Sequence, residues 1–254
     1  MRLQGKVILV TGAAGGIGAT AVHAFTREGA RVVATDSLAA PLEAVVAEAR
    51  FGGSEVVAIP GNIASGEDVH RIIAAGVEAF GALHVLFNNA GIMPGDDTSV
   101  VDTAEDAWQR VMDVNLNGVY LCCKHGIPAL LHFGGGSIIN IASFVALMGC
   151  TVPQDAYTAS KGGIVSLTRS LAVQYGRRGI RANAICPGPI ETAMLRTLWS
   201  SEDERNKRLN RIPLGRFGTP EDVVNAGVFL ASEESAWITG TTFLVDGGIT
   251  VNYF

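Results

Sequence analysis

Long apolar runs and long basic runs are both missing from this chain of 254 residues. No stretch of about 18 consecutive apolar residues occurs, so we expect no membrane-spanning helix. The formal net charge is −5, and Lys and Arg are not clustered as phosphate binding requires, which argues against a nucleic-acid-binding protein. The apolar part of the N-terminal segment is too short for a signal peptide. These features predict a soluble, cytoplasmic protein that binds no membrane.

Cysteine and histidine are too sparse and too scattered to suggest a disulfide framework or a metal centre. The four cysteines show no CxxC spacing, and only the run Cys122-Cys123-Lys-His125 resembles part of a ligand set. No second ligand pair with zinc-like spacing accompanies that run. We therefore expect no metal and mostly buried, reduced thiols.

Glycine and apolar residues, by contrast, are abundant. Hydrophobic residues make up 48% of the chain and charged residues 17%, so a substantial core is expected and disorder is not. There are 31 glycines in 254 residues, against about 7% in average proteins. They follow apolar runs, which is where glycine-rich ligand-binding loops occur.

Short apolar segments alternate with helical patterns along the whole chain. We predict strands at Lys6–Thr11, Arg31–Asp36, Glu55–Pro60, Leu83–Asn88, Gly136–Ala142, Ile180–Cys186 and Thr241–Asp246. Predicted helices cover Gly16–Glu28, Leu38–Arg50, a segment ending near Phe80, Ala104–His132, Asp155–Arg177 and Thr219–Ala231. This alternation predicts an α/β fold, a doubly wound Rossmann-type parallel sheet with helices on both faces. One domain spans residues 1–254, with a substrate lid at about 188–215.

A glycine-rich loop joins the first strand to the first helix in Thr11-Gly-Ala-Ala-Gly-Gly-Ile-Gly18. Glycines let the backbone approach a pyrophosphate, and the helix N-terminus supplies free N–H donors. The alternative is a glycine-rich turn retained for packing. The order of strand, loop and helix favours dinucleotide binding by Gly12, Gly15, Gly16, Ile17 and Gly18.

Asp36 ends the second predicted strand, where a carboxylate can accept hydrogen bonds from the adenosine ribose. It would repel a 2′-phosphate, and no Arg stands in the glycine loop or directly after Ser37. NAD is therefore favoured over NADP. Alternatively, Asp36 or Ser37 caps the following helix.

Several further segments complete a resemblance to a known family. They are Asn88-Asn-Ala-Gly91, Asn115, Ser143, Tyr157-x-x-x-Lys161, Pro187-Gly188 and Asp246-Gly-Gly248. With the glycine loop, their order and spacing resemble the short-chain dehydrogenase/reductases in their single-domain form, over essentially the whole chain. The resemblance implies a seven-stranded parallel sheet, NAD(P)-dependent interconversion of an alcohol and a carbonyl compound, and a homotetramer or homodimer with Ala104–His132 and Asp155–Arg177 at an interface.

The resemblance also implies individual roles. Asn62 and Ile63 would flank the adenine, Asn89, Ala90 and Gly91 would line the adenosine side, and Pro187, Gly188, Ile190 and Thr192 would hold the nicotinamide amide. The family commonly has Asp where this chain has Asn62. An Asn oxygen can still accept a bond from the adenine amine, so we expect at most a small change in affinity.

Tyr157 and Lys161 are four residues apart and so share one helix face. A positive charge about 4 Å away contributes about 4 kcal/mol at an effective dielectric constant near 20. We therefore expect Lys161 and bound NAD⁺ to lower the pKa of Tyr157 until it acts as a general acid and base. Ser143 would hold the substrate oxygen, and Lys161 would also hold the nicotinamide ribose. Asn115 would, by resemblance, anchor a water. Alone, Ser143 could be a turn residue and Asn115 a helix kink.

The substrate is expected to be a small to medium, mostly apolar alcohol or ketone, including cyclic ones. Its walls would come from residues after the fourth, fifth and sixth strands: Met93, Pro94, Ser143, Phe144, Val145, Met148, Cys150, Val152, Gln154, Met194, Leu195, Leu198 and Trp199. The last four could instead lie in a subunit contact. Alternative functions are a 3-oxoacyl-(acyl-carrier-protein) reductase and a non-catalytic nucleotide sensor. A sugar-nucleotide epimerase would need a longer C-terminal part.

Overall fold

The computed structural model describes residues 1–196, 199 and 201–253. Within them, seven strands form one parallel sheet in the order β3-β2-β1-β4-β5-β6-β7. The strands are β1 (Val7–Thr11), β2 (Arg31–Thr35), β3 (Val56–Ala58), β4 (Val85–Asn88), β5 (Gly136–Ile141), β6 (Ile180–Pro187) and β7 (Thr242–Val245). This confirms the predicted fold class and every predicted strand, with ends that differ by one or two residues.

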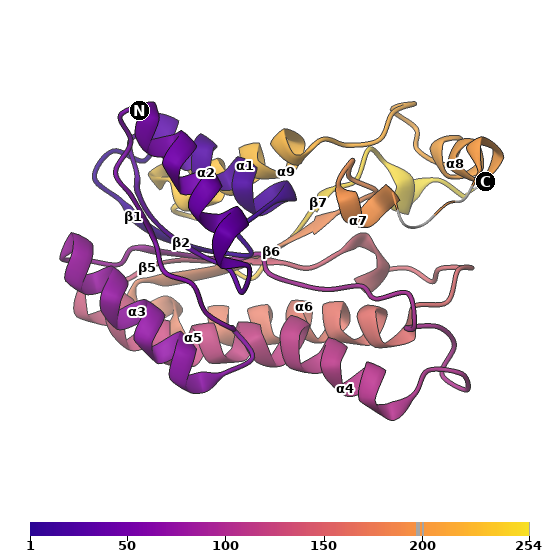
Figure 1. Ribbon diagram of the computed structural model, residues 1–254, viewed down its shortest axis with the longest axis horizontal. Helices are drawn as coiled ribbons and strands as arrows, with labels where there is room; N and C mark the ends of the chain where they lie inside the picture. Colours follow the sequence, from indigo (N-terminus) through magenta and orange to yellow (C-terminus); the bar gives the residue numbers. More distant parts are fainter. Residues whose placement is uncertain (197–198, 200, 254) are drawn as a thin grey trace.

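Helices cover both faces of the sheet (Figure 1). One face carries α1 (Gly16–Arg27), α2 (Ala39–Phe51) and α9 (Pro220–Ala231). The other carries α3 (Gly66–Phe80), α4 (Glu105–Met112), α5 (Gly118–His132) and α6 (Asp155–Tyr175). Two short helices, α7 (Ala193–Arg196) and α8 (Glu202–Leu209), follow β6. The three-layer arrangement explains why the central strands are apolar on both sides.

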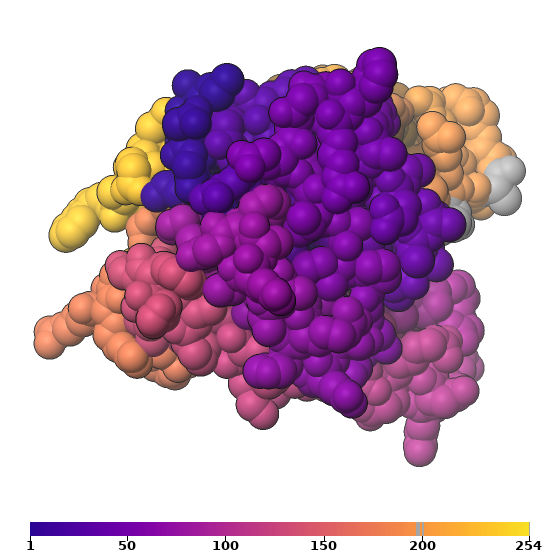
Figure 2. Space-filling model, turned by 60° about the vertical axis from the view of Figure 1, so that its left-hand side comes forward, coloured from indigo at the N-terminus to yellow at the C-terminus, as the bar shows by residue number. Residues whose placement is uncertain are grey.

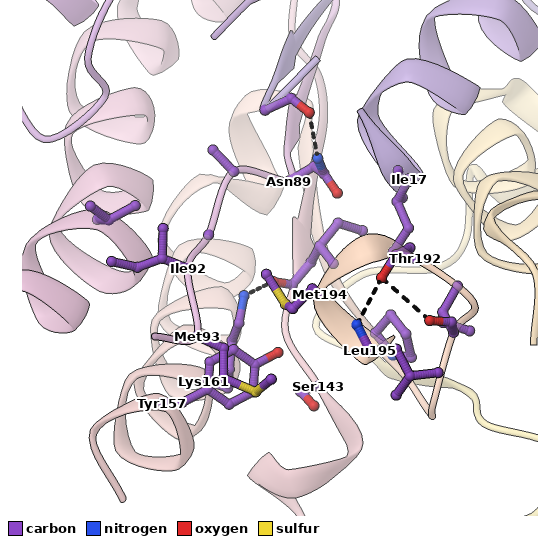
Figure 3. A pocket seen from close by; sticks show the side chains of 18 of the residues that line it. Ile17, Asn89, Ile92, Met93, Ser143, Tyr157, Lys161, Thr192, Met194 and Leu195 are labelled. Atoms are coloured by element: carbon purple, nitrogen blue, oxygen red, sulfur yellow. Dashed lines mark hydrogen bonds between the residues drawn. The ribbon is translucent and has the colours of Figure 1, made fainter. Parts of the chain in front are cut away.

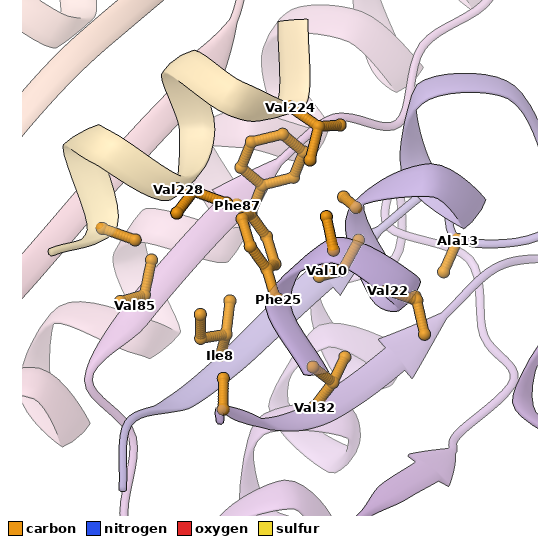
Figure 4. Packing of buried hydrophobic residues seen from close by; sticks show 14 of the residues in the cluster. Ile8, Val10, Ala13, Val22, Phe25, Val32, Val85, Phe87, Val224 and Val228 are labelled. Atoms are coloured by element: carbon orange, nitrogen blue, oxygen red, sulfur yellow. The ribbon is translucent and has the colours of Figure 1, made fainter. Parts of the chain in front are cut away.

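The core divides into two clusters, one on each face of the sheet. In β1, Ile8 and Val10 face the α1–α9 side, whereas Val7 and Leu9 face the α3–α5 side. All four are fully buried, as expected for side chains that alternate across a central strand. On the first side Phe25 of α1 meets Phe87 of β4 edge to face, with ring centroids 5.1 Å apart (Figure 4). Such a pair fixes α1 over the β1–β4 junction.

The strand order reverses between β1 and β4, which are hydrogen-bonded neighbours. The chain leaves β1 towards β2 on one side and leaves β4 towards β5 on the other. A crevice therefore opens beyond the carboxyl ends of these two strands, where parallel sheets bind ligands.

One part of the chain differs from the sequence-based prediction. The single helix predicted over Ala104–His132 is α4 and α5 joined by a π-helical turn, Asp113–Asn117. One extra residue in that turn directs the Asn115 side chain to the loop after β4. The segment 188–215 carries the short helices α7 and α8.

Two ion pairs join the N-terminal segment to the chain just after α9. Arg2 pairs with Glu234 and Lys6 with Glu233, each at 2.6 Å. In Figure 2 this N-terminal segment (indigo) lies beside the C-terminal part of the chain (yellow). Exposed pairs of this kind contribute little stability individually.

Among the helices of the described residues, none is both long enough and apolar enough to cross a bilayer.

Candidate active site

A cavity of about 560 Å³ opens at the carboxyl edge of the sheet, between the glycine loop and α6. Its size is typical of a small-molecule or cofactor site. Segments far apart in sequence line it: the loops after β1, β2, β4, β5 and β6, together with α6 and α7. Figure 3 shows side chains from these segments pointing towards the same space.

The glycine loop lies against the segment that follows β4. Gly12 has a φ of +67°, and a Cβ there would lie 2.8 Å from the Ala90 Cα. Gly15 and Gly16 line the cavity at the start of α1, and Gly15 caps that helix without a side-chain bond. First-turn N–H groups of α1 are thus turned towards the cavity without a side chain in front of them. Gly18 is buried behind the loop and does not line the cavity.

Asn89 binds the glycine loop to the end of β4. Its Nδ2 donates to the Thr11 carbonyl at 3.0 Å and to the Gly12 carbonyl at 3.2 Å. The Thr11 hydroxyl in turn accepts from the N–H groups of Asn89 and Ala90, at 3.0 and 3.1 Å. Four bonds therefore fix the width of the crevice, and Asn89, Ala90 and Gly91 all line it.

Asp36 lies at the cavity end nearest β2. One carboxylate oxygen accepts from the Ala14 N–H at 3.1 Å, and the other accepts from the Leu38 N–H at 3.0 Å. The bond to Leu38 shows that the helix-capping interpretation is partly right, because Leu38 immediately precedes α2. Asp36 and Ser37 nevertheless line the cavity, so both functions are compatible. The carboxylate is oriented by the glycine loop itself.

Asn62 and Ile63 form the neighbouring wall, after β3. The Asn62 Oδ1 accepts from the Ala64 N–H at 3.0 Å, and its own N–H donates to the Asp68 carboxylate at 2.8 Å. An amide oxygen has a second lone pair, so this bond leaves an acceptor site on Asn62. The pKa of Asp68 is lowered by the bond from Asn62 and by Arg71.

The segment after β6 forms the opposite side of the cavity. Pro187, Gly188, Ile190 and Thr192 all line it. A Cβ on Gly16 would lie 3.3 Å from the Thr192 Cγ2, so α7 stands directly across from the glycine loop. The Thr192 hydroxyl accepts from the Leu195 N–H at 3.4 Å, which caps α7. A ligand must therefore pass between these two helix starts.

Ser143, Tyr157 and Lys161 lie together at the inner end of the cavity (Figure 3). The Lys161 Nζ donates to the Ile141 carbonyl at 2.9 Å and lies 5.5 Å from the centroid of the Tyr157 ring. Lys161 is only 3% exposed. Ser143 follows β5 directly, and its hydroxyl accepts weakly from the Val145 N–H at 3.4 Å. It is thus a strand-end turn residue that also lines the cavity.

The charges of Tyr157 and Lys161 are governed mainly by burial. Burial raises the pKa of Tyr157, and a side-chain hydrogen bond with Ser143 acts in the opposite direction. Burial lowers the pKa of Lys161 to about 8. The expected lowering of the Tyr157 pKa by Lys161 is therefore not seen among the protein's own groups. The lysine ammonium lies beside the phenol ring and is bound to a carbonyl, and desolvation is the larger effect.

Asn115 lies beside Lys161 and does not line the cavity. It is fully buried, and its Oδ1 accepts from the Ile92 N–H at 2.8 Å while its Nδ2 donates to the Ile92 carbonyl at 2.9 Å and to the Ser160 hydroxyl at 3.1 Å. A Cβ on Gly91 would lie 3.3 Å from both the Asn115 Oδ1 and the Lys161 Nζ. Asn115 therefore connects the loop after β4 to α6 beside Lys161.

Most of the predicted substrate wall lines the cavity. Met93, Phe144, Val145, Cys150, Gln154, Met194 and Leu195 are among the lining residues. Met148, Pro94 and Val152 are not among the lining residues. Trp199 stacks on Phe217, with ring centroids 5.3 Å apart, and does not line the cavity. Leu198 lies outside the described residues.

Sequence reasoning missed several lining residues: Ala14, Leu38, Gly61, Ile92, Val114, Ile141, Ala142, Pro189, Ala193 and Arg208. Most adjoin a residue that was identified, and this adjacency was the available signal. Arg208 on α8 has no such neighbour in the sequence. It lines the cavity because the chain after α7 places α8 near it. With Asp36 and Lys161 it is one of three charged lining residues in the described part of the chain.

The cysteines have no common partner. Cys122, Cys123 and Cys186 are buried, and burial raises the pKa of Cys122 to about 12. Cys150 is exposed at the cavity. The described residues contain no group of three or more His, Cys, Asp or Glu side chains placed to hold a metal ion.

The lining fits a dinucleotide better than a compact ligand. Glycine N–H groups at a helix start suit a pyrophosphate, and a carboxylate at the end of β2 suits a ribose. A side chain on Gly12 would collide with Ala90, so the close backbone approach depends on glycine at that position.

Comparison with known proteins agrees with this geometry. Residues 12–250 match the family described as enoyl-(acyl carrier protein) reductase. The chain is 39% identical to the 3-oxoacyl-[acyl-carrier-protein] reductase of Thermotoga maritima, over 99% of this chain and 100% of that protein. It is 36% identical to the cyclohexanol dehydrogenase of an Acinetobacter strain, over 98% and 96%. The solved structure of levodione reductase is 31% identical, with a TM-score of 0.93, over 99% of this chain and 100% of the other.

The chain therefore belongs to the short-chain dehydrogenase/reductase family. It is an oxidoreductase acting on CH–OH groups with a nicotinamide cofactor. The expectation of family and enzyme class is confirmed.

Proposed function

We propose that this protein is an NAD-dependent dehydrogenase that interconverts a secondary alcohol and a ketone. The observation that carries the proposal is the convergence of Ser143, Tyr157 and Lys161 at one end of a cavity whose other end holds Asp36. The first three groups supply proton transfer to a substrate oxygen. The last supplies a site for a ribose without a 2′-phosphate.

In the direction of oxidation, tyrosinate 157 removes the hydroxyl proton of the substrate. NAD⁺, when bound, supplies the acceptor for the hydride that leaves the carbinol carbon. Ser143 donates a hydrogen bond to the substrate oxygen and keeps it within reach of Tyr157. In reduction the same residues act in reverse, and Tyr157 returns its proton to the carbonyl oxygen.

Lys161 stabilises the tyrosinate and binds the nicotinamide ribose. Its role is electrostatic, since a buried ammonium favours an anion nearby more strongly than an exposed one does. Burial lowers the pKa of Lys161 to about 8. Burial raises the pKa of Tyr157 among the protein's own groups, so the proposal relies on the positive charge of bound NAD⁺, together with Lys161, to favour the tyrosinate. Asn115 holds the Lys161 side of this cluster in place and anchors a water there.

NAD is proposed over NADP because the Asp36 carboxylate lines the cavity beside the glycine loop, where one of its oxygens accepts from the Ala14 N–H. A 2′-phosphate there would face an uncompensated negative charge. Around this end, cofactor contacts are assigned to Gly12, Gly15, Gly16, Ile17, Ser37, Asn62 and Ile63, and further along to Asn89, Ala90, Gly91, Pro187, Gly188, Ile190 and Thr192.

The substrate is proposed to be small to medium and mostly apolar, with cyclic alcohols and ketones included. Support comes from the apolar wall around Ser143, which Met93, Phe144, Val145, Met194 and Leu195 provide. The similarity to a cyclohexanol dehydrogenase points in the same direction. The segment 188–215 would act as a lid in a single-domain enzyme.

A 3-oxoacyl-(acyl-carrier-protein) reductase is the second candidate, because a reductase so named is 39% identical to this chain. Such an enzyme would reduce a 3-oxoacyl thioester, whereas the dehydrogenase proposed above would oxidise a small alcohol. The choice can be made by supplying each substrate class with each cofactor.

The deciding experiment measures reduction of NAD⁺ and NADP⁺ across secondary alcohols, cyclic diols, sugars and hydroxyacyl thioesters, with Tyr157→Phe as the control. We expect turnover of an apolar alcohol with NAD⁺ and a loss of about 10²-fold or more in the variant. Exclusive activity on a thioester with NADP⁺ would favour the acyl reductase. Retention of full turnover by Tyr157→Phe would exclude the mechanism.

We further propose a homotetramer or homodimer in the cytoplasm. Trp108 on α4, Tyr120 on α5 and Val173 on α6 expose 36%, 46% and 85% of their surfaces, more than large apolar groups usually do. Burial of these groups between identical chains would account for their exposure in one chain. Light scattering on the purified protein measures the mass directly, and a monomer across the micromolar range would contradict the assembly.

A further inference from the structure

The main chain of Tyr157 is held from both sides by side chains that come from elsewhere. Its N–H donates to the Oδ2 of Asp97 at 2.8 Å. Its carbonyl accepts from the Ser160 hydroxyl at 2.7 Å, and Ser160 accepts in turn from Asn115. The backbone position of the proposed proton donor is thus determined by the loop after β4 and by the π-helical turn.

Asp97 supplies the cap that α6 does not provide for itself. Gln154, the residue before the helix, makes no capping bond with its side chain. The Asp97 Oδ1 instead accepts from the Ala156 N–H at 3.0 Å, beside the bond from Tyr157. The adjacent Thr98 carbonyl accepts from the Asp155 N–H at 3.2 Å. Three consecutive first-turn donors of α6 are therefore satisfied by two residues about 60 positions earlier in the chain.

The cap is buried and carries a negative charge. Asp97 is only 5% exposed, although Asp side chains are rarely buried without partners. Bonds from N–H groups to a carboxylate are stronger than bonds to a neutral oxygen, and a helix N-terminus favours an anion. This attachment is therefore much firmer than an ordinary loop contact.

The loop between these attachments also forms part of the substrate wall. Ile92 at its start is bound by Asn115, Met93 lines the cavity, and Asp97 at its end binds α6. The loop is consequently fixed at its start to the π-helical turn, whose Asn115 also donates to Ser160 of α6, and at its end directly to the first turn of α6. The distance between the wall at Met93 and the Tyr157 backbone is set by these two attachments.

We propose that Asp97 is a positioning residue for the reaction. It holds Tyr157 at the correct distance from a substrate seated against Met93, and it does so without contacting substrate or cofactor. This inference depends on one part of the proposed function, namely that Tyr157 transfers the proton. Misplacement of a catalytic group by about 1 Å can cost about 10²-fold in rate. Loss of Asp97 should therefore lower kcat and leave cofactor binding at the glycine loop unchanged.

The test compares Asp97→Ala and Asp97→Asn with Asp96→Asn as the matched control. Asp96 is the neighbouring carboxylate, 60% exposed on its side chain and paired with Arg110 at 2.7 Å. We expect kcat for alcohol oxidation to fall about 10–100-fold in Asp97→Ala, with the KM for NAD⁺ within about twofold of wild type. Asp97→Asn should lose less, because its amide oxygen keeps one acceptor. Asp96→Asn should match wild type.

A second measurement does not depend on activity. Hydrogen exchange of the peptide covering residues 154–160 reports the first turn of α6. Its rate should rise about tenfold or more in Asp97→Ala, by less in Asp97→Asn, and not at all in Asp96→Asn. In Asp97→Ala, unchanged exchange, unchanged kcat, or a rise in the KM for NAD⁺ as large as the fall in kcat would each overturn the proposal. Should Asp97→Ala fail to fold, Asp97→Asn is used in its place, and the absence of any fall in kcat or of any rise in exchange would overturn the proposal. If the wild-type protein were inactive on every substrate, the proposed function would be contradicted. The exchange measurement would still show whether Asp97 holds the first turn of α6.

Discussion

The carboxamide of Asn115 binds the main chain of one residue, Ile92, through both its N–H and its carbonyl, at 2.8 and 2.9 Å. These paired bonds connect the π-helical turn to the loop after β4. A helix of regular geometry would place this side chain elsewhere, so the extra residue in the turn is what permits the contact. Lys161 and Gly91 lie immediately beside it.

Replacement of Asn115 by Ala should lower both stability and activity. The variant removes the partner of the half-buried N–H and carbonyl of Ile92, at a cost of up to about 1–3 kcal/mol for each group left unsatisfied. We expect a lower urea midpoint and a kcat reduced about tenfold or more. Asn117→Ala, in the same turn and half-buried, is the control and should change either quantity only slightly. Wild-type stability in Asn115→Ala would show that the paired bonds carry no net free energy.

Cofactor choice should respond to the charge of Asp36. Asp36→Asn keeps a similar shape and removes the negative charge, which at close range is worth about 1–4 kcal/mol against a 2′-phosphate. We expect the ratio of kcat/KM with NADP⁺ to that with NAD⁺ to rise about tenfold or more. Glu43→Gln removes the same charge from the exposed surface of α2 and should leave the ratio unaltered. An unchanged ratio in Asp36→Asn would refute the electrostatic basis of the preference.

The glycine loop should not accept a side chain at its first position. Gly12→Ala combines a φ of +67° with a Cβ only 2.8 Å from the Ala90 Cα. Gly53→Ala is a matched control, since its φ is +83° but a Cβ there has no heavy atom within 4 Å. In Gly53→Ala the free energy of unfolding should fall only by the conformational cost of a positive φ, about 1–2 kcal/mol. In Gly12→Ala it should fall by more than that. Fluorescence titration should also show that Gly12→Ala binds NAD⁺ at least about tenfold more weakly than the wild type.

Stability should fall as the solution becomes mildly acidic, because of His84. The Nδ1 of this residue accepts from the Val7 N–H at 2.9 Å, at the start of β1. Burial lowers the pKa of His84, and Lys6 and Arg31 lower it further. The pKa is depressed only in the folded state, so the unfolded chain binds the proton more readily below its own pKa of about 6.5. The free energy of unfolding should therefore decrease as pH falls from 7 towards 5.

Urea titrations at fixed protein concentration across this pH range measure the effect. His84→Gln keeps an acceptor but removes the titration, so its dependence on pH should be shallower than that of wild type. His125, whose pKa is also lowered by burial and by Lys124 and His70, contributes with the same sign. A variant with both residues replaced by Gln should be the flattest. Equal slopes for wild type and His84→Gln would rule out His84 as a source.

The seven strands were predictable because local pattern alone identifies a buried parallel strand. β1 is apolar from Val7 to Val10, and the glycine loop follows the strand directly, so strand, turn and helix are all evident within residues 6–28. The cavity residues Gly12, Asp36, Ser143, Tyr157 and Lys161 were predictable for a related reason. Each stands at the end of a strand or on a helix face whose position in the sheet follows from chain order.

Other features of the site depended on contacts between distant segments. The π-helical turn at Asn115 was missed because its pattern is helical throughout. Met148 does not line the cavity, although it was predicted to form part of the substrate wall. Burial raises the pKa of Tyr157 among the protein's own groups, an effect that spacing along a helix does not reveal because it gives proximity but not the extent of desolvation.

The sequence by itself determined the order of strands and helices, the family and many of the residues that line the cavity. Those properties follow from side-chain periodicity and from residue types at strand ends, which are local. Tertiary structure alone decided that Asp97 caps α6, that Asn115 binds Ile92 and that burial governs the charges of Tyr157 and Lys161. Each of these depends on which distant groups meet and on how much water they exclude, quantities that a local pattern does not contain.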